Sequence, residues 1–152
     1  MRLTALVLLV AVLALTGCAL PAKKGGSAVP KAAMPDPTGL TVAAVYGPHE
    51  CGRGTAAMLL FLDENGQPGV GALYLFHATE DGKQEVDKLP SSLVDFEVRG
   101  EDVVFKEAFI DWDGDGYIDK HYATIEAYRA EFPNNDSRLC NVANELYSRR
   151  GR

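Results

Sequence analysis

The residues with the clearest capacity for chemistry form one acidic stretch, Asp111–Asp119. It holds four aspartates, with Gly114 and Gly116 between them. Carboxylates this close together repel one another unless a cation neutralises them, and an oxygen-only ligand set suits a hard cation such as Ca²⁺. The stretch therefore predicts a calcium-binding loop. The simpler alternative is a turn rich in Asp and Gly that holds no metal.

The spacing D-x-D-x-D-G-x-x-D of this stretch resembles the calcium loop of EF-hands and of related repeats such as dockerins and thrombospondin type 3 modules. The resemblance implies side-chain ligands at alternate positions, a sharp turn at Gly116, and a late ligand that binds directly or through water. The ligands it implies for a structural Ca²⁺ are Asp111, Asp113, Asp115, the backbone carbonyl of Tyr117, and Asp119.

The residues on either side of the loop depart from the EF-hand. The bidentate Glu expected at loop position twelve is replaced by Tyr122, and Glu107 stands where the entering helix needs an apolar residue. Both flanks are rich in β-branched and aromatic residues, which favour strands. We therefore expect a β-hairpin stapled by calcium rather than a pair of helices.

The three cysteines are consistent with an exported protein. If Cys18 carries lipid, Cys51 and Cys140 remain as an even pair, and an oxidising compartment favours a disulfide between them. The competing interpretation is a reactive thiol or a zinc ligand. His49 lies two residues before Cys51, but His-x-Cys alone is a weak signal, and the other histidines show no zinc-site spacing.

Cys18 is singled out by the segment that precedes it. Residues 1–17 combine one early Arg with an apolar run from Leu3 to Leu15, which is typical of a secretory signal peptide. The run ends in Leu15-Thr16-Gly17-Cys18, which resembles the bacterial lipobox. That resemblance implies cleavage before Cys18 and lipidation of its sulfur, and so a membrane anchor. An ordinary cleaved signal with a coincidental Cys is the alternative.

Residues 18–39 are predicted to be a flexible tether, because they are rich in Pro, Gly, Lys and Ala and show no hydrophobic period. Residues 40–152 are the predicted folded domain. From Leu40 onward, 20 acidic side chains against 11 basic ones leave a formal charge of −9, which argues against a nucleic-acid partner.

Short apolar runs separated by turn residues predict a mostly β domain, a small antiparallel sandwich or barrel-like fold of about six strands. A polar loop is expected over residues 79–92. The predicted strands are Leu40 to Tyr46, Thr55 to Leu62, Val70 to Ala78, Leu93 to Val98, Val103 to Ile110 and Lys120 to Tyr128.

The end of the chain has a helical period instead. Apolar residues from Leu139 to Tyr147 recur at i, i+3, i+4, i+7 and i+8, which places them on one helix face. Asp136 or Ser137 would cap this helix, and Cys140 would lie in its first turn. A disulfide from Cys140 would then clamp the helix onto the sheet.

Enzymatic activity is not predicted. The nucleophile elbow, the P-loop and the Rossmann fingerprint are absent from the sequence. We expect a non-catalytic lipoprotein of the bacterial cell envelope that is structural or binds another envelope protein. Ala19 lacks the acidic character of an inner-membrane retention signal, which favours the outer membrane where two membranes exist. The alternative is a calcium-dependent module that binds a saccharide or peptide, with Trp112 stacking on the ligand.

Overall fold

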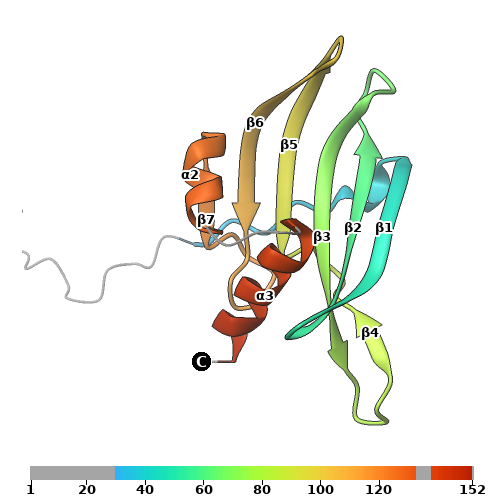
Figure 1. Cartoon of the computed structure of the whole chain (residues 1–152), viewed down its shortest axis with the longest axis vertical. Coiled ribbons are helices and arrows are strands. Elements are labelled where there is room, and N and C mark those ends of the chain that lie inside the picture. Colours follow the sequence, from blue (N-terminus) through green and yellow to red (C-terminus); the bar gives the residue numbers. More distant parts are fainter. Residues whose placement is uncertain (1–29, 133–137, 152) are drawn as a thin grey trace, which may run out of the picture. The chain divides into compact units, whose positions relative to one another are not determined.

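The computed structural model describes residues 30–132 and 138–151 (Figure 1). Lys31–Arg152 forms a compact unit that contains the sheet, the helices and the disulfide. The predicted signal peptide and Cys18 lie outside the described residues. No helix within the described ranges has the length and apolar character needed to cross a membrane.

The fold class predicted from the sequence is confirmed: the domain is mostly β and carries a C-terminal helix. Seven strands form one antiparallel sheet in the order β1-β2-β3-β5-β6-β7, with β4 paired to β3. The strands are β1 (Val42–Cys51), β2 (Gly54–Leu62), β3 (Pro68–Ala78), β4 (Gln84–Val86), β5 (Ser92–Arg99), β6 (Asp102–Ile110) and β7 (Lys120–Tyr122). The helices are the 3-10 turn η1 (Pro37–Gly39), α2 (Ile125–Ala130) and α3 (Arg138–Arg150).

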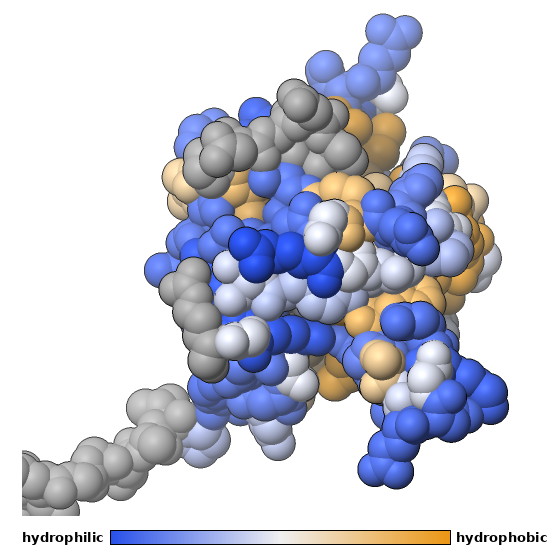
Figure 2. All heavy atoms as spheres, turned by 60° about the horizontal axis from the view of Figure 1, so that its bottom comes forward, coloured by the Kyte–Doolittle hydropathy of each residue, from blue (hydrophilic) through white to orange (hydrophobic). Residues whose placement is uncertain are grey.

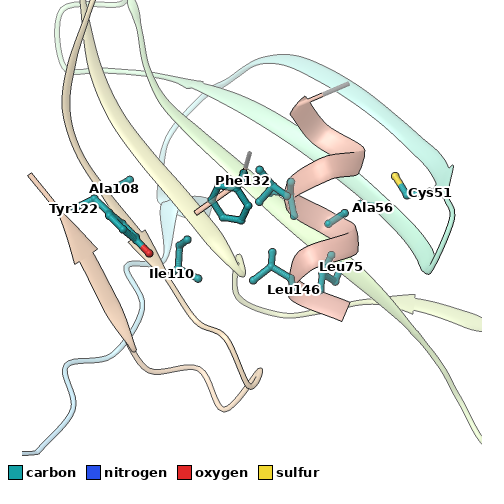
Figure 3. Packing of buried hydrophobic residues seen from close by; sticks show 11 residues of the cluster. Cys51, Ala56, Leu75, Ala108, Ile110, Tyr122, Phe132 and Leu146 are labelled. Carbon is teal, nitrogen blue, oxygen red and sulfur yellow. The ribbon is translucent and has the colours of Figure 1, made fainter. Parts of the chain in front are cut away.

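The main core lies between α3 and one face of the sheet (Figure 3). The predicted apolar stripe of α3 supplies the buried Val142, Ala143 and Leu146, and Leu146 projects toward the sheet beside Leu75 and Ile110. Burial of these side chains stabilises the packing of α3 on the sheet. Removing apolar surface from water lowers the free energy of the folded state by about 25 cal/mol per Å².

The opposite face of the sheet carries a second, smaller cluster. Phe61, Ala72 and Tyr74 are buried there, with Leu59 and Val70 packed against them. Strands β2 and β3 are therefore apolar on both faces. In Figure 2, which turns the bottom of Figure 1 forward, hydrophilic residues cover most of the described surface in view, and hydrophobic areas show between them.

The first strand is longer than predicted. It was expected to end at Gly47-Pro48, but β1 continues to Cys51, with a cis peptide bond at Gly47-Pro48 and an irregularity in the pairing with β2 between Tyr46 and His49. Proline is accommodated because β1 is an edge strand, where a missing amide donor leaves no central ladder bond unmade.

The strand predicted from Lys120 to Tyr128 is wrong in its second half. Strand β7 ends at Tyr122, and α2 follows. Thr124 caps that helix, because its hydroxyl accepts a hydrogen bond from the amide of Ala127 at 3.3 Å. Tyr128 then turns toward the sheet, where its hydroxyl lies 3.0 Å from that of Ser92. In Figure 1, α2 lies beside β6 and β7.

The expected polar loop over residues 79–92 also contains structure. Its middle forms β4, which pairs with the end of β3 from Phe76 to Ala78. Its end is buried, with Ser91 fully inaccessible. The amide of Ser91 donates to the carbonyl of Leu73 at 2.8 Å, which positions the start of β5.

The segment Lys31–Thr41, called the N-terminal segment below, belongs to the folded unit although residues 18–39 were predicted to be a tether. Met34 is only 3% exposed, and its amide donates to the carbonyl of Gly116 at 2.9 Å. At the other end, the carbonyl of Thr41 accepts from the amide of Leu62 at 2.8 Å. The folded part therefore begins at Lys31, because backbone pairing and one buried Met compensate for the lack of hydrophobic pattern.

The disulfide predicted between Cys51 and Cys140 is present. Cys51 is the last residue of β1, and Cys140 lies in the first turn of α3. Their Cα atoms are 5.1 Å apart although 89 positions separate them in the sequence. The bond joins the edge strand to the helix, as the clamp hypothesis required.

Candidate metal centre

The acidic loop connects β6 to β7, so the hairpin predicted around it is confirmed. Ile110, fully buried, ends β6 and pairs with Lys120 of β7. The amide of Asp119 donates to the carbonyl of Ile110 at 2.9 Å, which closes the loop. The amide of Asp111 donates to the carbonyl of Ser91 at 3.0 Å and fixes the loop to the chain preceding β5.

Asp111 organises the interior of the loop. It is 3% exposed, and its two carboxylate oxygens accept hydrogen bonds from the amides of Gly114 at 2.7 Å and Gly116 at 2.9 Å. Both glycines have positive φ angles, 79° and 85°, which residues with a side chain rarely adopt. The glycine positions of the sequence pattern are thus explained by the local conformation that wraps the backbone around one carboxylate.

The next two aspartates each use one oxygen locally and leave the other free of backbone bonds. Asp113 Oδ1 accepts from the amide of Asp115 at 3.1 Å, and Asp115 Oδ1 accepts from the amide of Tyr117 at 2.9 Å. Asp119 Oδ2 accepts from the amide of Trp112 at 2.8 Å. These bonds aim the remaining oxygens toward a common point.

The four predicted carboxylates are brought together. One oxygen from each of Asp111, Asp113, Asp115 and Asp119 lies within 4.8 Å of the others. Ligand oxygens surround Ca²⁺ at about 2.3–2.6 Å, so opposite ligands lie about 5 Å apart, and the four groups are close enough to bind one metal ion. Among the His, Cys, Asp and Glu side chains of the described residues, this is the one such group.

Tyr117 lies beside the cluster, and ligation by its carbonyl stays a prediction. Its amide donates to Asp115, and the residue forms an antiparallel bridge with Ala33 of the N-terminal segment. The amide of Ile118 donates to the carbonyl of Ala32 at 2.7 Å. Tyr117 therefore joins the loop to the N-terminal segment, while its side chain is 46% exposed.

The side chain of Lys31 lies among the carboxylates. Its Nζ donates to Asp119 Oδ1 at 2.6 Å and to Asp115 Oδ2 at 3.4 Å, and it lies 3.9 Å from Asp113 Oδ2. The ammonium group thus occupies the position toward which three of the four carboxylates point. A cation bound there competes with Lys31 for the same oxygens.

Burial and hydrogen bonding act in opposite directions on the charges of the loop. Burial raises the pKa of Asp111 above its ordinary value, although the amides of Gly116 and Gly114 stabilise the carboxylate. Burial also opposes the charge of Asp119, but the hydrogen bonds from Lys31 and from the Trp112 amide outweigh it and lower the pKa of that carboxyl. The pKa of Lys31 is raised, first by its hydrogen bond to Asp119.

The C-terminal end of α3 also contacts the acidic loop, through Arg150. Arg150 donates to Asp87 Oδ2 at 2.7 Å and to Ser91 Oγ at 2.8 Å. Its guanidinium also packs against Gly114, where an added Cβ would lie 2.7 Å from Cζ. The positive φ angle of Gly114 favours glycine, and a side chain there would also have to displace the Arg150 guanidinium.

Trp112 is packed against the protein. The guanidinium carbon of Arg149 lies 3.5 Å from the centroid of the Trp112 ring, a cation–π contact, and the ring of Phe132 lies 6.0 Å away. Arg149 is itself held by Glu131 at 3.1 Å and Glu145 at 3.0 Å. This arrangement covers one face of the Trp112 ring.

Sequence reasoning missed three residues at this site. Arg149 and Arg150 follow the apolar stripe of α3, so basic residues there are explained by the helix dipole alone. Lys31 lies in a stretch with the composition of a linker. The one signal that points to Lys31 is that it is the last lysine before the acidic domain, and that signal is not specific.

The chemistry of the centre is that of cation binding by hard oxygen ligands. Comparison of the chain with protein-family models, with curated proteins and with solved structures found no match.

Proposed function

We propose that this chain is a non-catalytic lipoprotein of the bacterial cell envelope, whose β domain is stabilised by Ca²⁺ in the β6–β7 loop and serves a structural or protein-binding role. The observation that carries the proposal is the convergence of four aspartate oxygens within 4.8 Å. Carboxylates gathered this closely suit a divalent hard cation. Calcium is plentiful outside the cytoplasm, so a site of modest affinity suffices there.

The membrane anchor is supported by the lipobox-like Leu15-Thr16-Gly17-Cys18. The disulfide between Cys51 and Cys140 is in keeping with an oxidising compartment and leaves Cys18 as the remaining cysteine. Ala19 favours the outer membrane in a cell with two membranes.

A protein-binding role is supported by β1, which lies at the edge of the sheet. Val42, Val45 and Tyr46 on this strand are 47%, 60% and 46% exposed. An exposed edge strand with apolar side chains offers backbone groups and side-chain contacts to an extended segment of a partner protein. The envelope protein that we propose as the partner would add to this edge.

The calcium proposal is tested by thermal unfolding of residues 19–152, which contain the whole compact unit. We expect a Kd on the order of 10⁻⁴ to 10⁻³ M, because the loop lacks the bidentate Glu of sensor sites. At a tenfold excess of calcium over Kd, binding stabilises the folded state by roughly 1.4 kcal/mol. That corresponds to a rise of a few degrees in Tm for a domain of this size.

Asp113→Asn should abolish this rise, since the amide keeps the oxygen that accepts the Asp115 amide but loses the charge that a cation needs. The matched control is Asp102→Asn, an exposed aspartate at the start of β6, which should keep the full calcium effect. The calcium concentration is raised to about 10 mM, ten times the highest Kd expected. If the Tm of the unsubstituted protein does not change, the loop is a turn that binds no calcium.

The anchor is tested by mass spectrometry of protein extracted from membranes. We expect an N-terminal peptide that begins at Cys18 and carries added acyl mass. Recovery of a chain that retains Met1, or of soluble protein cut at another position, contradicts the lipoprotein assignment.

A further inference from the structure

A pocket of about 720 Å³ opens on the face of the sheet that carries α3. Its floor is formed by β2, β3 and β5, and its walls by α2 and the first turns of α3. This volume falls within the range of about 300–1,000 Å³ that is usual for small-molecule sites. The floor side chains are apolar and comprise Met58, Leu60, Leu73, Val94 and Phe96.

The hollow in the floor is explained by the pairing of the strands. Gly71 of β3 pairs with Leu60 on one side and with Val94 on the other, so a residue without a side chain lies between two apolar ones. A Cβ added at Gly71 would meet only Leu60 at 3.6 Å and Phe96 at 3.9 Å, which are ordinary contacts. The apolar floor is thus open to an occupant, and covering it with apolar atoms is favourable.

The walls of the pocket carry positive charge. Arg129 projects from α2 and Arg138 from α3, and both line the pocket. Within residues 30–132 and 138–151 neither forms an ion pair, whereas Arg99, Arg149 and Arg150 each pair with a carboxylate. None of the described lining residues is acidic. The described lining of the pocket is therefore positively charged, whereas the chain as a whole has a formal charge of −6.

Two hydroxyl groups add hydrogen-bonding capacity beside the arginines. Ser92 and Tyr128 are both lining residues, and their hydroxyl oxygens lie 3.0 Å apart. One hydrogen bond between them uses a single hydroxyl proton, which leaves the second available to an acceptor on a bound molecule.

We propose that this pocket binds an amphiphile with one apolar chain and an anionic head, such as a fatty acid or a lysophospholipid. The chain lies on the apolar floor, and the head pairs with Arg129 and Arg138. Charge complementarity selects this class: a cationic amphiphile meets two arginines, and an uncharged chain leaves their pairing capacity unused. None of the four aspartates of the calcium site lines this pocket, although Phe132 in its wall packs against Trp112 of the β6–β7 loop.

The test is an NMR titration of residues 19–152 with decanoate, decan-1-ol and decyltrimethylammonium, each kept below micelle-forming concentration. We expect saturable shifts of the Gly71 and Val94 amides with decanoate, and binding at least tenfold tighter than that of decan-1-ol. A lysophosphatidate with a decanoyl chain distinguishes a lysophospholipid from a fatty acid as the ligand. Binding at least tenfold tighter than decanoate indicates a lipid head, and equal or weaker binding indicates a free carboxylate.

Two variants test separately how the arginines and the apolar floor contribute to binding. Arg129→Gln combined with Arg138→Gln should weaken the binding of decanoate at least tenfold and leave the binding of decan-1-ol unchanged. The control is Arg53→Gln on the exposed β1–β2 turn, which should alter neither affinity. Gly71→Leu should fold, because its Cβ has room, and should block both ligands by filling the floor.

The proposal is overturned if decanoate gives no saturable shifts at Gly71 and Val94. Equal affinity for decanoate and decan-1-ol, or a decanoate affinity unchanged by the double arginine substitution, also overturns it. Repeating the titration with calcium removed by a chelator should give the same Kd, so loss of the calcium site and loss of this pocket are separate results.

Discussion

Lys31 is the residue on which the state of the acidic loop depends. Its ammonium group neutralises part of the charge that four carboxylates place together, and it does so with one hydrogen bond of 2.6 Å to Asp119 and two longer contacts. The side chain is about half exposed, with a relative accessibility of 46%. Solvent screens ion pairs as exposed as these, so they contribute little to the stability of the fold.

Lys31→Met should therefore strengthen calcium binding. A divalent cation no longer has to displace the ammonium, so the Kd for calcium should fall by up to about fivefold. Without calcium the same variant should melt slightly below the unsubstituted protein, because the carboxylates repel one another unopposed. Calcium titrations followed by Trp112 fluorescence measure the first effect.

Lys83→Met is the matched control for this experiment, since Lys83 pairs with Asp81 at 2.7 Å on the β3–β4 turn and is 78% exposed. It should leave the calcium affinity unchanged. An unaltered Kd in Lys31→Met would show that the ammonium and the metal do not share the site.

At the scale of elements, Tyr147 fixes α3 to the sheet. Its hydroxyl lies 2.7 Å from the carbonyl of Thr55 and 2.6 Å from that of Phe76, and it accepts from the amide of Phe76 at 3.0 Å. One hydroxyl thus bridges β2 and β3 just beyond their last backbone pair, Ala56 with Leu75. The ring lies against Gly54 with no room for a side chain there.

Tyr147→Phe should destabilise the domain by about 1–3 kcal/mol, because the amide of Phe76 and the carbonyl of Thr55 lose a partner in a partly buried position. Urea unfolding monitored by circular dichroism gives the free energy of unfolding. The control is Tyr46→Phe on the exposed part of β1. It also removes a hydroxyl, but it should change the free energy of unfolding by no more than about 0.5 kcal/mol. Equal losses in the two variants would contradict the bridging role.

The elements that sequence reasoning predicted are those with a clear period or a clear turn. Strands β2, β3, β5 and β6 were found because apolar runs end at Asp-Gly or Gly-containing turns, and α3 because its stripe repeats along more than two turns. Helix α2 was missed because Ile125 and Tyr128 are also strand-forming residues, and six residues are too few to establish a period. Its signal was Thr124, a residue type favoured at helix N-caps.

At the scale of the whole molecule, the disulfide joins the two ends of the folded chain. It links β1, at one edge of the sheet, to the helix that packs across the sheet face. A loop of this length restricts the unfolded chain considerably, and the chain-entropy estimate assigns it roughly 4 kcal/mol.

Replacing both Cys51 and Cys140 by Ala should lower the free energy of unfolding by about that amount, roughly 4 kcal/mol. Urea denaturation of the double variant measures it, and reduction of the unsubstituted protein provides a control that leaves the sequence unchanged. A loss below about 1 kcal/mol would mean that α3 stays docked through its apolar stripe alone.

The candidate site was predicted from the sequence only as far as its ligands are neighbours along the chain. Asp111 to Asp119 lie in one loop, so their convergence follows from local geometry. Lys31 and Arg150 reach the loop through tertiary folding, and neither has a distinguishing sequence context. The pocket beside α2 was not foreseen for the same reason: its floor and walls come from elements that only the assembled sheet brings together.

The attachment of the N-terminal segment has a mechanical consequence. In a protein held to a membrane through Cys18, tension enters the domain at Lys31, and it loads the bond from the Ile118 amide to Ala32 before the bond from the Met34 amide to Gly116. Peeling the segment as far as Thr41 releases about 10 residues, roughly 35 Å of extra reach at full extension. This extension involves neither the strand pairs of the sheet nor the Cys51–Cys140 disulfide, because β1 begins at Val42. If the proposed anchor at Cys18 exists, the acidic loop is the point at which a pull on it is first resisted, and a ligand that releases Lys31 would let the domain stand farther from the membrane.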